Sequence, residues 1–404
     1  VLMPLYQKGL KRTQTFHIAF LLDRFLTLLT GRAKNRRVPF GKVLSSEEVK
    51  QKFPLVNSKG LKGGALWYDA AVPDSQRYIT ELLCRVNNCG AVTLNYMKAS
   101  QITRSNGSVT GVSARDQLTG SQYTFKSDVI VNSAGPWIRE IAEQFGIPEP
   151  DMYPPSLMWN VLFDREALSE SALGVSSFVN DGQIYFLHPW KGRLLVGTGH
   201  ASRASIKDNP EPTSEEIDQF IRGLNDAIPE LDLSSDEILH IYSGYVSVKA
   251  DDNLDLIKND ALIDHSQKDG PVGLFSLQGT KFTAARATAE MVIDQVFAKT
   301  SLKDDMHCNG TDDSLQWEYS YNWYPGHSEE EWKKNLQSII QNESVIHLDD
   351  LILRRTTLGD NPERAIKLAP SIADLFEWDE ERKEQEIHRI HEYFHWFKVS
   401  TDRT

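Results

Sequence analysis

The stretch SLQGTKFTAARATAEM, residues 276–291, contains the residue types that could hold an anionic group. A short apolar run, GLFSL, leads into Gly279, and Thr280, Lys281 and Thr283 precede an alanine-rich segment. A helix that begins there would present unpaired backbone N–H groups and the positive end of its dipole, beside the charge of the lysine. This combination suits a phosphate or the electron-rich edge of a reduced ring. A plain turn followed by a solvated lysine is the alternative that these residues leave open.

A second stretch, SDVIVNSAGPW at 127–137, repeats this design. A β-branched run ends at Gly135, where the backbone can approach a ligand because no side chain stands in the way. An ordinary strand-to-helix turn has the same residues. Sheets of this kind bind ligands at the carboxyl ends of their strands. We therefore expect segments 60–145 and 272–298 to lie side by side, with Gly135 and Gly279 at one edge of one sheet.

Capping and turn residues indicate the elements that position these two turns. Asp74 begins the helix DSQRYITELLCRVNNCG, and Asn106 with Gly107 indicates a hairpin. Residues 153–250 read mostly as strands with one helix. Two capping boxes and one proline-started helix are also expected, at Thr213 with Glu216, at Ser328 with Glu331, and at Pro362 after Asn361.

The composition is that of an acidic globular protein of two or three domains. The 404 residues carry a net charge of −12, with a pI near 5.5, which argues against a nucleic-acid partner. The three cysteines, at 84, 89 and 308, have no CxxC spacing and cannot all pair. A reduced, cytoplasmic compartment is therefore expected.

The most apolar stretch, HIAFLLDRFLTLL at 17–29, is too short for a membrane span and is interrupted by Asp23 and Arg24. Its spacing predicts an amphipathic helix, which we expect to pack on the core. The alternative is peripheral contact with an anionic membrane surface, such as the inner face of a membrane. Four basic residues that follow the helix would assist this contact, namely Arg32, Lys34, Arg36 and Arg37.

Taken together and in order, five stretches carry a family resemblance. They are GGALWYDAAVPDSQRYITELLCRVNNCGAVTLNYMKA, VIVNSAGPW, IYFLHPWKGRLLVGTGH, LFSLQGTKFTAARATAEM and HLDDLILRRTTLGD. In this combination the chain resembles the flavin-linked glycerol-3-phosphate dehydrogenases, which belong to the wider group of D-amino-acid-oxidase-like flavoproteins. The resemblance covers nearly the whole chain and implies FAD as the cofactor. It further implies oxidation of glycerol 3-phosphate to dihydroxyacetone phosphate by hydride transfer, with electrons passed to a quinone-type acceptor.

The resemblance also implies roles for individual residues. Lys281 and Tyr245 are the implied catalytic residues, and Lys281, Lys249 and His188 are the implied substrate contacts. A packing role on Trp190 is an equal alternative for His188. The implied cofactor contacts lie in three stretches and are Met97, Lys98 and Ala99; Ala134, Gly135 and Trp137; and Gly279, Thr280, Phe282 and Thr283.

The expected fold is α/β, with a truncated Rossmann-like FAD domain, an antiparallel-sheet substrate domain and a C-terminal helical domain. Residues 1–59 form a substrate-domain or helical segment in this interpretation. Residues 60–148 and 272–299 form the two parts of the FAD domain. Residues 149–271 form the substrate domain, and residues 317–404 form the helical domain.

Three features depart from the family pattern. The fingerprint G-x-G-x-x-G is absent, and the nearest match, GTGHAS at 197–202, leads to a proline-containing turn rather than to a helix. Since the chain opens on the apolar VLMPLYQKG with valine and not methionine at residue 1, we expect a fragment of a larger protein. Without the fingerprint, we expect this fragment to bind FAD weakly or not at all. Many members of the family carry an arginine soon after Tyr-Ser-Gly, whereas this chain has YVSV after Gly244. The third departure, Gly279 followed by Thr280 in place of a glycine pair, still permits the turn.

Two other functions stay open at the level of the sequence. The chain could be another oxidoreductase of this type, acting on a 2-hydroxy acid or an amine, or a non-catalytic remnant. No metal site is expected. His388, His391 and His395 share one helix without a completing cysteine or carboxylate cluster, and Asp251, Asp252 and Asp255 match a calcium loop only loosely.

Overall fold

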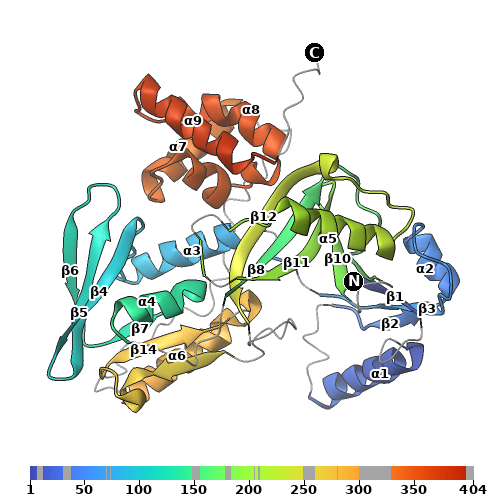
Figure 1. Cartoon of the computed structure of the whole chain (residues 1–404), viewed down its shortest axis with the longest axis horizontal. Coiled ribbons are helices and arrows are strands. Elements are labelled where there is room, and N and C mark those ends of the chain that lie inside the picture. Colours follow the sequence, from blue (N-terminus) through green and yellow to red (C-terminus); the bar gives the residue numbers. More distant parts are fainter. Residues whose placement is uncertain are drawn as a thin grey trace.

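The computed structural model has three parts, which Figure 1 separates: a large sheet with α5, a smaller α/β unit, and a C-terminal cluster of helices. The structure describes residues 1–6, 12–30, 38–69, 71–72, 74–147, 155–177, 183–203, 205–207, 210–248, 260–279, 281–299 and 329–396. The mixed α/β architecture agrees with the predicted fold class. The domain boundaries themselves stay a prediction.

The large sheet has eight strands in the order β12-β8-β11-β10-β9-β1-β3-β2. Neighbouring strands are antiparallel except β1 and β9, which run parallel. The strands are β1 (Leu2–Leu5), β2 (Lys42–Leu44), β3 (Gly63–Leu66), β8 (Pro155–Phe163), β9 (Leu173–Ser176), β10 (Ile184–Trp190), β11 (Arg193–Ser202) and β12 (Ile238–Ser247). Segments 1–6 and 42–66 thus join the same sheet as 155–247, although about 90 residues separate them in sequence.

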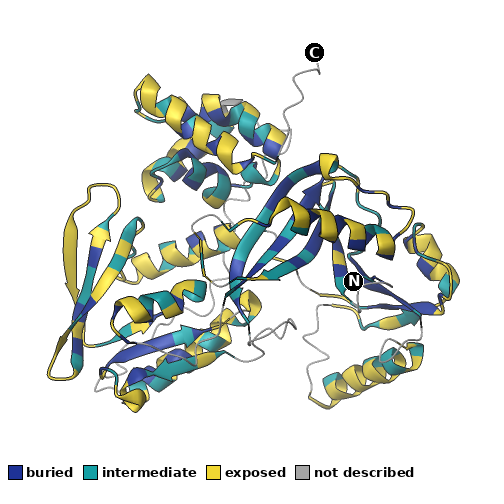
Figure 2. Cartoon of the chain, viewed as in Figure 1, coloured by how far each residue is buried: buried dark blue, intermediate teal, exposed yellow. Residues whose placement is uncertain are grey.

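One face of this sheet is covered by helix α5 (Ser214–Ala227). The predicted capping box is present, because the Thr213 hydroxyl accepts from the Glu216 N–H while the Glu216 carboxylate accepts from the Thr213 N–H. Phe220 of α5 meets the rings of Trp159 and Tyr185 edge-on, with centroids 6.4 and 5.4 Å away. Figure 2 shows the buried core along the strands beneath this helix.

The smaller α/β unit brings together two segments that are far apart in sequence. Strand β7 (Ile130–Asn132) pairs in parallel with β14 (Leu274–Gln278), and β13 (Ala261–Asp264) pairs antiparallel with β14. Helices α4 (Ile138–Gln144) and α6 (Ala285–Lys299) follow the two parallel strands. The pairing of Ser276 with Asn132 confirms that Gly135 and Gly279 lie at the same edge of one sheet.

The same unit carries a three-stranded meander, β4 (Met97–Ser105), β5 (Ser108–Asp116) and β6 (Gln122–Lys126), and helix α3 (Ser75–Asn88). The predicted hairpin is confirmed, with positive φ angles of 50° at Asn106 and 79° at Gly107. The predicted start of α3 is also confirmed, because the Asp74 carboxylate accepts from the Arg77 N–H at 2.8 Å.

The C-terminal cluster consists of α7 (Glu329–Asn342), a π-helical turn (Asp350–Arg355), α8 (Pro362–Ala373) and α9 (Glu380–Tyr393). It has a core of its own, in which Leu336, Leu351 and Ile372 are fully buried. Asn361 caps α8 as predicted, accepting from the Arg364 N–H at 2.9 Å. The box predicted at Ser328 lies outside the described residues. Short 3-10 turns elsewhere are Gly135–Trp137, Ser235–Glu237, His265–Lys268, Phe282–Ala284 and Leu358–Asp360.

Helix α1 (Thr13–Leu29) corrects one prediction. Phe16 stacks on Trp67 of the sheet with centroids 6.4 Å apart, yet α1 has no buried residue. Its outer side chains are 50–67% exposed, namely Ile18, Leu21, Leu22, Phe25, Leu26, Leu28 and Leu29. The prediction that this helix packs on the core is therefore wrong for most of its surface. A shorter helix, α2 (Ser46–Lys52), packs Val49 into the sheet's core instead. Among the described residues, no helix is long and apolar enough to cross a membrane.

Candidate functional site

The two predicted glycine turns form a matched pair. Asn132 and Ser276 are level with each other on β7 and β14, and each strand reaches its glycine three residues later. Gly135 has a φ of 58°, and a Cβ added to it would meet no atom within 4 Å. At Gly279 the reason for glycine is different, because a Cβ there would come within 2.8 Å of the Asp260 carboxylate. Gly135 thus borders open space, while Gly279 permits close packing.

A buried polar network joins the two strand ends beneath these turns. The Asn132 amide donates to the Ile138 carbonyl at 3.1 Å and lies 3.4 Å from the Ser276 hydroxyl. Its own oxygen accepts from the Ala134 N–H at 3.3 Å, and the Ser276 hydroxyl lies 2.8 Å from Nε2 of His265. The three side chains that link the strands are at most 6% exposed. Buried hydrogen-bonded groups of this kind hold both turns in one geometry.

The predicted ligand-facing side chains of the two turns are exposed. Lys281 and Thr283 are exposed, Phe282 is 41% exposed and Trp137 is 42% exposed. The Ala284 N–H donates to the Lys281 carbonyl at 3.0 Å, which forms the turn that opens α6. Phe282 also meets the ring of Tyr78 on α3, 5.8 Å between centroids. Thr280 lies outside the described residues.

The third predicted cofactor stretch begins β4. Met97 is half-buried, Lys98 is exposed, and Ala99 packs against a small core. This core also includes Leu274 of β14, so β4 and the two glycine turns belong to one unit. The predicted cofactor residues that the structure describes are therefore all placed on this α/β unit.

The large sheet has two faces, because side chains alternate along its strands, and the face covered by α5 carries the core. Trp159, Ile241 and Tyr245 belong to the core on the α5 side, and the Tyr245 hydroxyl accepts from the Lys207 N–H at 3.1 Å. The neighbouring position Tyr242 lies on the other face, against His240, with ring centroids 4.6 Å apart. The structure therefore places Tyr245 on the core face and Tyr242 on the opposite face of the sheet. Lys249 lies outside the described residues.

The strand register orders the second face into rows. The paired residues, from β12 across to β10, are His240, Leu162, Leu195 and His188; then Tyr242, Asn160, Gly197 and Phe186; then Gly244, Met158 and His200; and finally Val246, Ser156 and Ser202. None of these residues is a lysine, an arginine or a carboxylate. His188 lies at the far end of the first row, with its ring 6.0 Å from that of Trp190. We call this set of rows the polar face.

The polar face meets the other two parts of the molecule along β12. At one end of the strand, the rings of Tyr393 and Phe394 lie 4.9 and 5.1 Å from His240. The 3-10 turn Gly135–Trp137 also contacts β12, which Figure 1 shows running from the C-terminal helices toward the α/β unit. A Cβ on Gly244 would meet nothing within 4 Å, so space is open on the polar face there. The turn at Gly135 thus lies against the edge strand of the polar face, with open space at Gly135 and at Gly244.

Three histidines of the polar face differ in their surroundings. Burial lowers the pKa of His240 to about 3, with a smaller contribution from His395. Burial and, to a smaller extent, the charge of the N-terminus lower the pKa of His188. Burial alone lowers the pKa of His200. All three are therefore neutral near pH 7. The sequence analysis missed His200, Tyr242 and Asn160, because which face a strand residue occupies depends on pairing and not on residue type.

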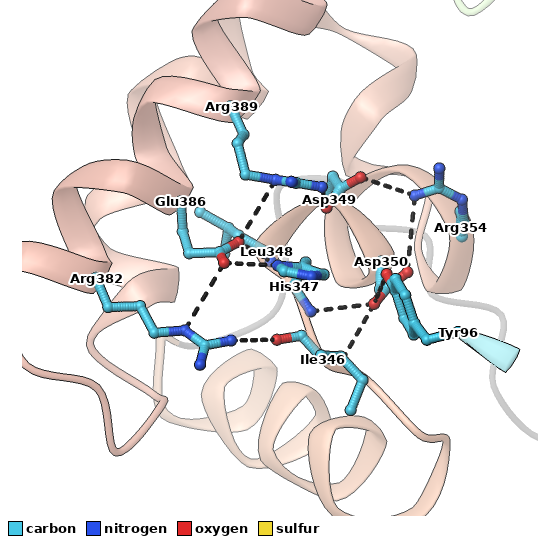
Figure 3. Close-up of polar contacts among 10 residues, drawn as sticks. All are labelled: Tyr96, Ile346, His347, Leu348, Asp349, Asp350, Arg354, Arg382, Glu386 and Arg389. Carbon is cyan, nitrogen blue, oxygen red and sulfur yellow. Dashed lines mark hydrogen bonds and ion pairs between the residues drawn. The ribbon is translucent and has the colours of Figure 1, made fainter. Parts of the chain in front are cut away.

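A cluster in the C-terminal helices has the composition of a metal site. Nitrogen and oxygen atoms of His347, Asp349 and Glu386 lie within 4.8 Å of one another (Figure 3). The carboxylates already have positive partners, because Arg354 and Arg389 lie 3.0 and 3.1 Å from the two Asp349 oxygens. Burial would raise the pKa of Asp349, but these arginines hold it below its usual value. The cluster is thus an ion-pair network in which the carboxylates already have partners.

This network also fastens the C-terminal helices to the α/β unit. The Tyr96 hydroxyl donates to Asp350 at 2.8 Å, and the same carboxylate accepts from the backbone N–H of His347 at 3.0 Å (Figure 3). Arg77 of α3 donates to Glu343 at 2.6 Å. On the other side, Lys191 of the large sheet lies 3.1 Å from Asp360. The C-terminal helices therefore hold both parts that border the candidate site.

Comparison with known proteins assigns the family. The sequence model of a family described as "FAD dependent oxidoreductase" matches residues 6–295. The chain belongs to this family. The match spans the large sheet except β1, both glycine turns and most of α6, and it ends before the C-terminal helices.

Relatives within this FAD-dependent oxidoreductase family are named glycerol-3-phosphate dehydrogenases. One from Synechocystis sp. is 30% identical over 279 residues, which cover 66% of this chain and 50% of the relative. An aerobic glycerol-3-phosphate dehydrogenase from Staphylococcus aureus is 29% identical over 275 residues, which cover 66% of this chain and 47% of the relative. The chain therefore matches about half the length of these relatives.

Solved structures of the family share the fold. The glycerol-3-phosphate dehydrogenase from Bacillus halodurans, solved with FAD, superposes with a TM-score of 0.68 at 20% identity. That superposition covers 90% of this chain and 81% of the solved one. The L-proline dehydrogenase from P. horikoshii gives a TM-score of 0.51 at 20% identity, covering 74% of this chain and 73% of the other. At these identities the likeness concerns the fold.

Proposed function

We propose that this chain is part of an FAD-dependent dehydrogenase that oxidises glycerol 3-phosphate to dihydroxyacetone phosphate. The family assignment and the names of the relatives support the substrate. The single observation that carries the proposal is the pairing of β7 with β14, which sets two ligand-type turns at one sheet edge. When bound there, FAD would accept a hydride from the substrate carbon.

The residues present at the turns fit such a cofactor. Gly135 leaves room for close approach, and the side chains of Trp137 and Phe282 offer apolar surface to a ring system. Helix α6 begins directly after the 3-10 turn Phe282–Ala284, and Lys281 stands two residues beyond Gly279. A positive helix end and a lysine together stabilise negative charge that develops on a ligand during hydride transfer.

The test is FAD binding followed by substrate reduction of the bound flavin. The full-length protein, of which this chain is a part in our proposal, is titrated with FAD by fluorescence quenching, and glycerol 3-phosphate is then added without oxygen while the flavin absorbance is recorded. Bleaching at the flavin bands is the expected result. Flavin binding without bleaching would reject this substrate, and failure to bind FAD would instead support a non-catalytic remnant.

A second candidate is an oxidoreductase of the same family that acts on a 2-hydroxy acid or an amine. The observation that favours it is the composition of the polar face, whose rows contain no cation to pair with a phosphate. Val246 occupies the last row, two residues after Gly244. A substrate panel of glycerol 3-phosphate, lactate, glycine and proline, read by flavin bleaching, separates the two candidates.

We further propose that electrons pass to a quinone and that α1 docks on the anionic membrane surface that contains it. The seven exposed apolar side chains of α1 form the contact in this proposal, and the four basic residues at 32–37 in the sequence supply complementary charge. Co-sedimentation with vesicles of phosphatidylglycerol is expected, with loss in Leu21→Glu. The matched control is Leu118→Glu, an exposed leucine of the β5–β6 turn (51% exposed). If both variants co-sedimented with the vesicles to the same extent as the wild type, the docking would be contradicted.

A further inference from the structure

We propose that His200 and Asn160 handle the reacting hydroxyl group of the substrate: Asn160 orients it, and His200 takes its proton. The inference rests on the proposed function and adds the two residues that act opposite the cofactor. Neither residue belongs to the turns that the family resemblance singles out.

The position of His200 follows from an irregularity in β11. The register shifts between Gly197 and Gly199, so that one extra residue enters the strand. A Cβ on Gly199 would strike the ring of Trp159, which belongs to the core, so Gly199 faces the α5 side. The next residue, His200, therefore faces the polar side. It pairs with Met158, which pairs in turn with Gly244, where space is open.

Asn160 lies one row away, on the neighbouring strand. It pairs with Gly197, and its amide oxygen occupies the place that a Gly197 side chain would take, 1.8 Å from an added Cβ. Within the part of the chain that the structure describes, no hydrogen bond of this amide is found. Two residues along a strand span about 6.5 Å, so Asn160 and His200 are diagonal neighbours within reach of one small ligand.

His200 has the chemical state that the step needs. Its Nδ1 is buried without a hydrogen-bond partner among the described residues, and burial lowers its pKa, so the ring is neutral and one nitrogen can accept a proton. The other titratable groups on this face are less suited. His240 lies beneath Tyr393 and Phe394, His188 lies in the first row, and Tyr242 is level with Asn160 but leans on His240.

The step balances as an alcohol oxidation. FAD bound at the two turns would take up the hydride, with the electron pair of the C–H bond that breaks at the carbinol carbon. The O–H bond breaks and its proton passes to the unprotonated ring nitrogen of His200, while the carbon–oxygen bond becomes a carbonyl. A neutral base suits this role, because the proton and the hydride leave in the same conversion.

The test compares His200→Gln with the matched control His388→Gln on α9, where the histidine side chain is 73% exposed. All proteins are full-length and saturated with FAD, and reduction by glycerol 3-phosphate is followed by stopped flow. We expect FAD affinity within about twofold of wild type in both variants. Loss of the proton acceptor should slow reduction ~10²–10⁴-fold in His200→Gln only. Imidazole added to His200→Ala should restore part of the rate.

A second readout does not depend on turnover. The ring signal of His200 in a proton–carbon NMR spectrum, assigned by its loss in His200→Gln, should shift when dihydroxyacetone phosphate is added. Asn160→Leu should weaken that shift. If glycerol 3-phosphate does not reduce the flavin bound to the wild type, the proposed function is rejected and this assignment with it. An active wild type with His200→Gln reduced at the same rate, or a His200 signal unmoved by the ligand, would overturn only this assignment.

Discussion

Arg77 offers a sharp test of how the C-terminal helices are held, and the change we consider is Arg77→Met. The guanidinium is 4% exposed, donates to both oxygens of Glu343 at 2.6 and 2.9 Å, and donates to Glu81 at 2.8 Å. Burial by itself would lower the pKa of Arg77, but these two carboxylates outweigh it and raise the pKa. The arginine is charged at every working pH.

The magnitude follows from what the substitution leaves behind. The Glu343 side chain is only 10% exposed, so without Arg77 its carboxylate would stay buried and unpaired. Removing one partner of a buried ion pair costs about 3–5 kcal/mol. With a urea m-value of about 2 kcal/mol per M, the unfolding midpoint of the C-terminal helices should fall by about 1.5–2.5 M.

The assay is urea unfolding followed by tryptophan fluorescence, with Arg139→Met as the control. Arg139 pairs with Glu143 at 3.1 Å, but these side chains are 45% and 51% exposed. An exposed pair of this spacing contributes about 0.3–0.5 kcal/mol, so the control should hardly move. The double variant Arg77→Met, Glu343→Leu should recover part of the loss. Equal midpoints for Arg77→Met and Arg139→Met would refute the reasoning that the buried pair holds the helices.

Three further outcomes are expected. In the full-length protein, Lys281→Met should slow flavin reduction ~10²–10³-fold by stopped flow, while equilibrium substrate binding changes little; rates within twofold would remove the lysine from the site. Gly135→Val should weaken FAD binding at least ~10-fold by fluorescence quenching, since φ is 58° and the new side chain would fill the open space. Gly107→Val, with φ of 79° and equal room, should leave FAD affinity unchanged. Because burial lowers the pKa of His240 from 6.5 to about 3, the unfolded chain binds that proton first, and stability falls as pH drops from 6.5 toward 3. Between pH 8 and pH 5 the wild type should lose about 2 kcal/mol of its free energy of unfolding, and His240→Phe should not lose this amount. An equal difference between the urea midpoints of the two proteins at pH 8 and at pH 5 would contradict this.

Local signals in the sequence determined the turns, the helix caps and the two glycines that follow β7 and β14. Asp74, Thr213 and Asn361 each satisfy N–H groups of their own helix within three residues, so neighbouring residues were enough to predict them. The left-handed turn at Asn106 and Gly107 follows from the residues themselves. The apolar strands before Gly135 and Gly279 made their parallel pairing foreseeable, because two such units share a sheet edge.

Only the tertiary structure decided which side chains share the polar face and what covers α1. The extra residue between Gly197 and Gly199 reverses the alternation in β11 and turns His200 toward the polar face. Tyr245 and Tyr242 are equally plausible in the sequence, and strand pairing separates them by face. The burial of a helix side chain also depends on the tertiary structure, because the residues that cover it are remote in sequence. Arg77 finds Glu343 across 266 residues, whereas the leucines of α1 meet none within the described chain that bury them. Such contacts depend on how long-range elements pack, and local residue patterns carry no record of that packing.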